Sequence, residues 1–253
     1  MRRIILLTVT LCFLPAILFV GGAAAQTDEF AMANEFYENK DYSSAVRLYL
    51  SVLNHGAESA NLYFNLGNAY FKDGDLGHAV FYYLKARRLA PDDQDIIHNL
   101  EFVRQFSRVQ MEGVELNPLR TFFIGLVEGY RLGTLAWLSS IFFILFVLIL
   151  CVRYGLGVSN FPVRIGAVVL LVLLLASSGL TSFKYRDDYL TRRAVIITED
   201  ANVHTGPSDQ SDVELEGAPG LIVEIISETV DYYDVLFENK RRGWIKKDQV
   251  AVL

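Results

Sequence analysis

Cysteine is nearly absent from this chain, with only two in 253 residues. Cys12 lies in an apolar N-terminal run and Cys151 lies in a later apolar run, so the polar parts of the chain contain no thiol. Disulfides, cysteine-ligated metals and cysteine nucleophiles are therefore excluded from those parts.

The polar parts also lack a concentrated positive charge. Residues 26–118 carry 8 Lys/Arg against 14 Asp/Glu, and residues 189–253 carry 7 against 12. Nucleic-acid binding depends on basic side chains that displace counterions from phosphates, so we expect no nucleic-acid partner. The local basic run ENKRRGWIKK, residues 238–247, is either a solvated hairpin or a patch for phosphate or anionic lipid.

Patterns typical of catalysis are missing as well. The chain has four histidines and none has a second histidine at metal-ligand spacing: His55, His78, His98 and His204. No G-x-S-x-G, H-E-x-x-H or phosphate-binding glycine loop occurs. We therefore expect no enzymatic activity, no cofactor and no metal. The alternative is a membrane hydrolase whose site forms only in three dimensions.

The N-terminus has the pattern of an export signal. Arg2 and Arg3 precede the apolar run Ile4 to Val20, and three alanines end at Ala25. This pattern predicts a signal peptide over residues 1–25 with cleavage after Ala25. An uncleaved membrane anchor is the alternative, and in both cases the following residues face away from the cytoplasm.

Two later apolar runs are long enough to cross a membrane. Residues 135–152 and 165–183 contain no charged side chain, and about 20 helical residues span a hydrocarbon layer of about 30 Å. We predict two transmembrane helices joined by a short cytoplasmic loop over residues 153–164. Both flanking parts would then lie outside the cytoplasm.

The distribution of positive charge opposes this orientation. Basic residues are expected on the cytoplasmic side, yet more of them follow the second run than occupy the loop. The loop contains Arg153 and Arg164, whereas the segment after the second run contains Lys184, Arg186, Arg192 and Arg193. Sidedness therefore stays open at this point, with the export signal favouring the outside.

The stretch from Asn61 to Pro91 has helical spacing with small residues where two helices must touch. Its pattern coincides with the tetratricopeptide signature at Tyr63, Leu66, Gly67, Tyr70, Ala79, Tyr83, Ala86 and Pro91. KDGDLG, residues 72–77, supplies the turn between the two helices. A looser copy lies 34 residues earlier, at Met32, Ala33, Phe36, Ala45 and Tyr49. Residues 91–106 begin a third helix that lacks a partner.

Residues 26–112 thus resemble a short tetratricopeptide domain of two repeats plus a capping helix. The resemblance implies a concave groove for a peptide or protein segment, lined by the first helix of each repeat. The side chains implied for this groove are Phe30, Asn34, Tyr37, Phe64, Asn65, Asn68 and Phe71. Asn34 and Asn65 match two positions of a carboxylate clamp, but the clamp's basic residues are missing, so an extended or apolar segment is expected. The alternative is that these aromatics only fill the stack.

A linker over residues 113–134 separates this domain from the first membrane run. Leu119 to Tyr130 is apolar but contains Arg120 and Glu128, which indicates a helix lying along the membrane surface more than a third crossing.

In the C-terminal part, residues 193–253, apolar and polar residues alternate with a period of two. This pattern predicts short strands separated by turns. Its motifs resemble those of bacterial SH3 domains and would form a small all-β barrel. The matching residues are Asn202, Val203, His204, Gly206 and Pro207, then Tyr233 and Val235, then Gly243, Trp244 and Ile245. His204 stands where these domains usually have arginine. We expect it to be structural, and the alternative is a pH-dependent ligand contact.

The order of the parts resembles the BatE-like membrane proteins of bacterial Bat aerotolerance operons. The resemblance implies a non-enzymatic scaffold in the bacterial inner membrane, with its tetratricopeptide and SH3-like domains in the periplasm. It also implies partners among other Bat-type membrane proteins, including von Willebrand factor A domain proteins, in an envelope complex linked to stress. A second hypothesis is an adaptor that binds peptidoglycan through the SH3-like domain.

Overall fold

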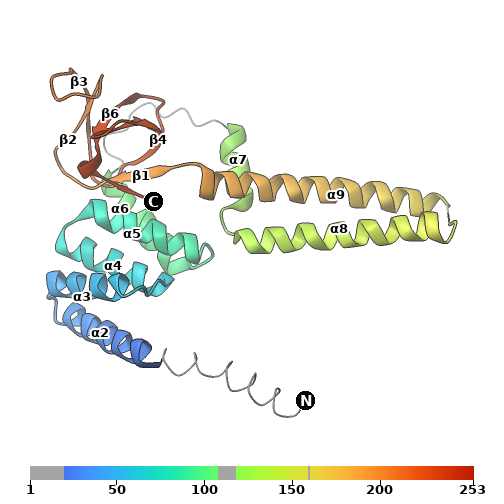
Figure 1. The fold of residues 1–253 in the computed structure, drawn as a ribbon, viewed down its shortest axis with the longest axis horizontal. Helices are drawn as coiled ribbons and strands as arrows, with labels where there is room; N and C mark the ends of the chain where they lie inside the picture. The colour runs from blue at the N-terminus through green and yellow to red at the C-terminus, as the bar shows by residue number, and fades with distance from the viewer. Residues whose placement is uncertain (1–19, 108–117, 159) are drawn as a thin grey trace, which may run out of the picture.

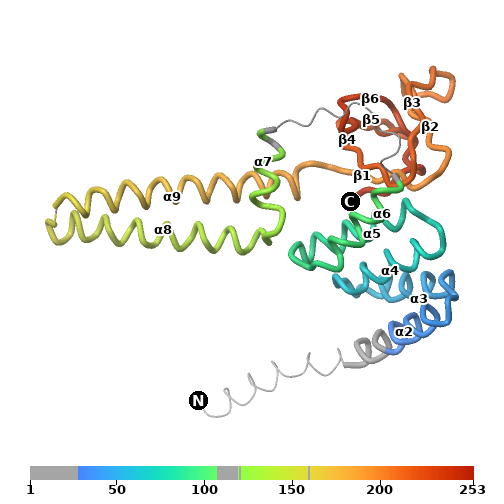
Figure 2. The backbone as a smooth tube through the Cα atoms, turned by 180° about the vertical axis from the view of Figure 1, so that it is seen from behind, coloured from blue at the N-terminus to red at the C-terminus, as the bar shows by residue number. Residues whose placement is uncertain are grey.

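A computed structural model describes residues 20–107, 118–158 and 160–253. Three parts follow one another: a helical stack, a long apolar hairpin and a β-sheet (Figure 1). The sheet lies directly beside the helical stack, and the hairpin projects from the place where the two meet (Figure 2). The predicted signal peptide falls mostly on residues 1–19, outside the described residues.

The helical stack consists of α2 (Val20–Glu38), α3 (Tyr42–Asn54), α4 (Ala60–Asp73), α5 (Leu76–Leu89) and α6 (Gln94–Ser107). A side chain caps the N-terminus of α3, of α4 and of α5, and so marks where each of these helices begins. Asp41, Ser59 and Asp75 each accept a hydrogen bond from the backbone N–H three residues later. The predicted turn KDGDLG is shorter than expected, because Asp75 starts α5 and places Gly77 inside that helix. Helix α2 runs through Ala25, the predicted cleavage position.

The hairpin consists of α8 (Leu132–Gly155) and α9 (Phe161–Tyr185), both longer than the charge-free runs that predicted them. The helices continue past the apolar residues because Arg153 still fits in the last turn of α8 and Asn160 caps α9. Helix α7 (Pro118–Val127) runs across the base of the hairpin (Figure 1). It forms within the stretch where the sequence predicted a surface-lying helix, includes Gly125 and ends at Val127, before Gly129.

The sheet follows a π-helical turn, η3 (Arg186–Leu190), and contains seven antiparallel strands. These are β1 (Arg193–Ile196), β2 (Ala201–His204), β3 (Val213–Gly217), β4 (Ile222–Glu228), β5 (Tyr232–Leu236), β6 (Arg242–Lys246) and β7 (Val250–Val252), the last after a short 3-10 turn, η4 (Lys247–Gln249). The strand order is β3-β2-β6-β5-β4-β1-β7.

The sheet is not closed, which differs from the predicted barrel. Among the described residues β3 and β7 form the two edges and do not pair with each other. β7 has three residues and β3 is mostly exposed, so neither edge offers the other a long partner. One face of the sheet still buries a core that includes Ile196, Val203 and Ile245.

Candidate functional site

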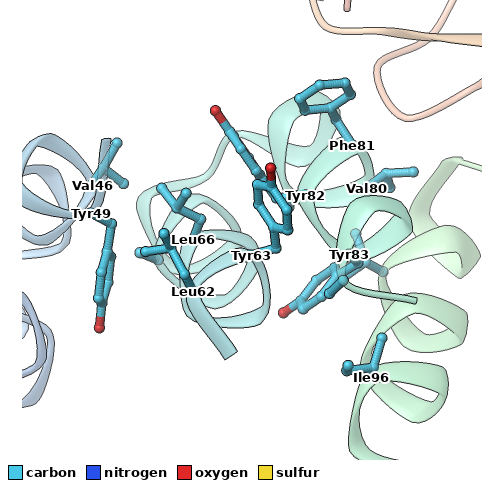
Figure 3. Close-up of a cluster of buried hydrophobic side chains, with 14 of the residues drawn as sticks. Val46, Tyr49, Leu62, Tyr63, Leu66, Val80, Phe81, Tyr82, Tyr83 and Ile96 are labelled. Atoms are coloured by element: carbon cyan, nitrogen blue, oxygen red, sulfur yellow. The ribbon is translucent and has the colours of Figure 1, made fainter. Parts of the chain in front are cut away.

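The repeats are held together by small residues that face aromatic rings. A Cβ on Gly67 of α4 would lie 2.7 Å from Cδ1 of Tyr83 on α5, so only glycine lets the two helices approach this closely. Tyr83 is 1% exposed, and Tyr49 occupies the equivalent place in the preceding repeat (Figure 3). Burial raises the pKa of Tyr49 to about 12 and also raises that of Tyr83. Both phenols are therefore neutral hydrogen-bond donors at physiological pH.

These two phenols donate to a ladder of asparagines that repeats every 34 residues. Asn34 Oδ1 accepts from the hydroxyl of Tyr49 at 2.6 Å and from Nδ2 of Asn65 at 3.1 Å. Asn68 Oδ1 accepts from Tyr83 at 2.6 Å and from Nδ2 of Asn99 at 2.9 Å. The ladder joins each repeat to the next.

The predicted clamp asparagines, Asn34 and Asn65, are thus brought together, but they bond to each other. Oδ1 of Asn34 and Oδ1 of Asn68 each receive two donors, which matches the two lone pairs of an amide carbonyl. Among the described residues no acceptor is within hydrogen-bond distance of Nδ2 of Asn34 or Asn68. The Nδ2 groups of Asn34 and Asn68 can therefore still donate a hydrogen bond to an acceptor on a ligand.

Phe30 and Phe64 have equivalent places in the two repeats and pack against the buried tyrosines. Phe30 lies 5.6 Å from the ring of Tyr49, and Phe64 lies 5.9 Å from that of Tyr83. Both phenylalanines are partly buried against the core of the stack. Tyr37 is likewise partly buried and makes an edge contact with Tyr42 at 5.4 Å. These three aromatics fill the stack as well as line its first-helix side.

Phe71 lies in a different environment, beside α6. Its ring centre lies 5.7 Å from that of Phe102 and 6.0 Å from that of Phe106, and both of these residues are on α6. Phe102 is 44% exposed and Phe106 is 53% exposed, so the three rings present an aromatic surface to solvent. Sequence reasoning missed the two α6 rings and Asn99. The 34-residue step from Asn65 would have indicated Asn99.

The helices that carry these side chains are acidic. Helices α2, α4 and α6 together contain seven Asp/Glu and two Lys/Arg. A ligand of the first-helix side would meet aromatic rings, amide groups and a negative field, which favours a segment with apolar and positive residues.

The opposite side of the stack is covered by the sheet. β1 packs against α5, the second helix of its repeat, and Val195 of β1 is fully buried in the core of the stack. A Cβ on Gly77 of α5 would lie 2.5 Å from Cα of Ile197. Ile222, Ala251 and Leu253 pack on the same core. The sheet thus covers α5, a second helix, and among the described residues its strands do not pack on the first helices α2 and α4.

The SH3-like motif residues come together on three adjacent strands. His204 of β2 pairs with Trp244 of β6, and Tyr233 of β5 pairs with Ile245 of β6. Val235 pairs with Gly243, where a Cβ would lie 2.5 Å from Cγ1 of Val203. The motif therefore encodes how β2, β6 and β5 pack. Asn202 and Pro207 are exposed, and Gly206 lies between them against Ser211.

His204 is 7% exposed, and its Nδ1 lies 2.9 Å from the carbonyl oxygen of Ser211. This contact closes the loop that contains Gly206 and Pro207. The geometry favours the structural role over a ligand contact.

Two neighbouring residues of β5, Tyr233 and Asp234, contact cationic side chains. The buried carboxylate of Asp234 accepts a bidentate pair of bonds from the guanidinium of Arg242, which lowers the pKa of Asp234. Next to it, the ring of Tyr233 lies 4.9 Å from Nζ of Lys247 and 5.9 Å from the guanidinium of Arg192. Both cations also bond to Glu228.

The structure brings no catalytic constellation together in the part of the chain that it describes. No group of three His, Cys, Asp or Glu side chains there could hold a metal ion. His78 bonds to Asp75 at 2.6 Å and stacks on Tyr70, which stabilises the first turn of α5.

Comparison with protein families confirms the repeats. Residues 60–93 match a tetratricopeptide repeat model, and residues 33–74 match a second model described as a TPR repeat. No curated protein matches the chain significantly. Tetratricopeptide repeats are modules for protein–protein interaction, and the chain contains them on the elements α2 to α5.

Proposed function

We propose that this protein is a non-enzymatic, membrane-anchored scaffold that binds a protein segment on the first-helix side of its repeats. The carrying observation is the aromatic surface of Phe71, Phe102 and Phe106 on the side that the sheet leaves uncovered. Exposed aromatic patches are typical of protein interaction sites. The acidic helices favour a partner segment with apolar and basic residues.

Membrane anchoring is supported by the exposure of the hairpin. The most apolar 18-residue windows of its two long helices are 6% and 11% buried, whereas the core helix of a soluble protein would be mostly buried. Small and hydroxyl side chains join the helices to each other. Ser139 and Thr181 share a hydrogen bond at 3.1 Å, and Gly166 accommodates Ile149.

Helix α7 supports the same proposal. Its exposed apolar residues are Leu119, Phe122, Phe123 and Leu126. Phe123 contacts Phe183 of α9 at 5.6 Å, which fixes α7 to the base of the hairpin. A helix in this position would lie along the membrane surface with its apolar side chains in the lipid.

We infer that the repeats and the sheet lie on one side of the membrane, because they pack against each other at the same end of the hairpin. Two of the basic residues at and just after the end of α9 have local partners. Lys184 pairs with Asp188 at 3.3 Å, and Arg193 pairs with Asp187. These pairs offset part of the positive charge at this end of the hairpin, and the export signal supports the periplasm in this proposal.

On the resemblance to BatE-like proteins, we propose the bacterial inner membrane as the location. Other Bat-type membrane proteins, including von Willebrand factor A domain proteins, are the proposed partners in an envelope complex linked to stress. Peptidoglycan binding by the sheet is a second candidate, favoured by Arg192 and Lys247 beside Tyr233, since cell-wall peptides carry carboxylates.

The binding proposal predicts that the double variant Phe102→Ala/Phe106→Ala weakens recovery of membrane partners with the full-length chain by about 30-fold. Each substitution removes an exposed aromatic ring that a partner would bury. Burial of one such ring contributes about 1 kcal/mol or more to the binding free energy. Quantitative mass spectrometry of partners that co-purify from solubilised membranes measures the effect. Phe161→Ala is the matched control, because Phe161 is 75% exposed at the far end of the hairpin. Equal recovery with all three chains would remove this surface from the proposal.

The orientation predicts the behaviour of reporters that are active only outside the cytoplasm. A fusion after Leu253 should be active and a fusion at Gly157, in the turn of the hairpin, should be silent. Activity at Gly157 with silence at Leu253 would invert the orientation. A chain released from membranes by alkaline carbonate would instead contradict the anchoring.

A further inference from the structure

A cavity of about 600 Å³ lies where the repeats, α7, η3 and the sheet meet. Its walls include Leu84 and Arg88 of α5, Ile124 and Val127 of α7, and Ile222 of β4. The start of α8 and the end of α9 also reach it, through Leu132 and Lys184. The cavity therefore opens at the base of the hairpin.

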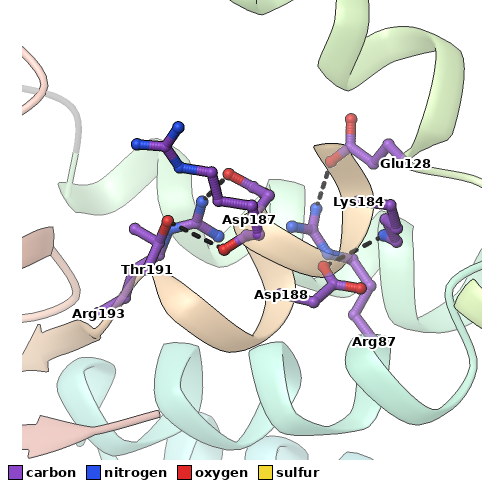
Figure 4. Close-up of polar contacts among 8 residues, drawn as sticks. Arg87, Glu128, Lys184, Asp187, Asp188, Thr191 and Arg193 are labelled. Carbon is purple, nitrogen blue, oxygen red and sulfur yellow. Dashed lines mark hydrogen bonds and ion pairs between the residues drawn. The ribbon is translucent and has the colours of Figure 1, made fainter. Parts of the chain in front are cut away.

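The lining of this cavity is basic, although the whole chain has a net charge of −6. Eight Lys/Arg and five Asp/Glu line it. Part of this charge is paired, as Figure 4 shows for Arg87 with Glu128, Lys184 with Asp188, and Arg193 with Asp187. Arg104 and Glu238 form a further pair at 3.7 Å.

Two of the cations have aromatic partners instead. The guanidinium of Arg88 lies 4.7 Å from the ring centre of Tyr189, which also lines the cavity. Nζ of Lys85 lies 5.0 Å from the ring centre of Tyr63 and 5.2 Å from that of Phe81, both beside the cavity lining. Among the described residues no carboxylate forms an ion pair with either of them. They keep their hydrogen-bond donors for an anion.

Most of the uncharged wall is apolar, with Leu84, Ile124, Val127, Ile222 and Leu253 among its residues. A site with surplus cations, an apolar wall and a position at the membrane surface matches an amphiphilic anion. Basic pockets beside membrane helices bind phospholipid headgroups for these reasons.

We propose that this cavity binds the phosphate-bearing headgroup of an anionic phospholipid, with Arg88 and Lys85 facing the phosphate and α7 lying beside the acyl chains. The proposal rests on the membrane anchoring proposed above. The bound lipid would contact the repeats, the sheet and both ends of the hairpin together, and so would hold the scaffold at a set height above the membrane.

The test is native mass spectrometry of the full-length chain in nonionic detergent, titrated separately with phosphatidylglycerol, phosphatidylcholine and inorganic phosphate. We expect one phosphatidylglycerol to bind at least tenfold more tightly than phosphatidylcholine. The Lys85→Gln/Arg88→Gln variant should lose this preference, whereas Arg47→Gln, an exposed change on α3 that bonds only to Ser44, should keep it.

Equal retention of the two lipids by the unaltered chain would overturn the proposal. So would competition by inorganic phosphate at the same concentration as the lipid, because the site would then select free phosphate. Carbonate extraction of the same chain separates this test from the anchoring: a chain that stays in membranes but shows no preference contradicts the cavity proposal alone.

Discussion

Replacing Gly77 by valine is expected to separate the sheet from the repeats. The new Cβ would lie 2.5 Å from Cα of Ile197 and 2.8 Å from the carbonyl oxygen of Ile196. Because both are backbone atoms, no side-chain rotation relieves the overlap, and β1 must move away as a unit. Hydroxyl-radical footprinting of the full-length chain should show labelling of Val195, now fully buried, rise several-fold.

Gly125→Val is the control for this change, since a Cβ there meets no atom within 4 Å. Labelling of Val195 should then stay at its original level. Unchanged labelling in the Gly77 variant would mean that the sheet is not held against α5, and the uncovered side of the repeats would no longer be defined.

Gly67→Val is expected to destabilise the second repeat by about 3 kcal/mol, through overpacking of a filled core. The added Cβ would lie 2.7 Å from Cδ1 and 3.0 Å from Cγ of Tyr83, which is 1% exposed and has no space to rotate into. Displacing this ring also breaks its 2.6 Å bond to Asn68. Amide hydrogen exchange of α4 and α5 should accelerate by about 100-fold, the equivalent of that free energy.

The sheet and the hairpin serve as internal references in the hydrogen-exchange measurement, because the substituted residue does not lie in either of them. Exchange in β5 and β6 should be unaffected by the substitution. Acceleration across every element would indicate that the chain unfolds as one unit, and an unchanged rate in α4 would show that the two helices are packed less tightly than the distances indicate.

The repeats were predictable because their signature is local. Gly67, Ala79 and Tyr83 stand at spacings that a helix converts directly into a packing face, and the copy 34 residues earlier has the small residues Ala33 and Ala45 followed by Tyr49. The role of the asparagines was not predictable in the same way. Asn34 and Asn68 were interpreted as ligand-facing, whereas their oxygens bond to a tyrosine of the same repeat and to an amide of the next. Only the stacking of two repeats brings those donors close.

Strands with apolar alternation were also predictable, and the others were not. β4 and β5 are rich in Val, Ile and Tyr, whereas β3 has the sequence VELEG and is mostly exposed. β3 forms because β2 offers it a backbone partner. The open edges of the sheet likewise depend on strand lengths and pairing, which the motif residues on β2, β5 and β6 do not specify.

By itself, the sequence determined the elements: the repeat helices through their period and small residues, and the hairpin through its charge-free length. The tertiary structure alone decided that the sheet covers α5, that Phe71 meets Phe102 and Phe106, and that cations from several elements surround one cavity. The physical reason is the separation along the chain between the residues that interact. A helix or strand is set by neighbours a few residues away, whereas Gly77 and Ile197 are far apart in the chain and meet only when two complementary surfaces exclude water between them.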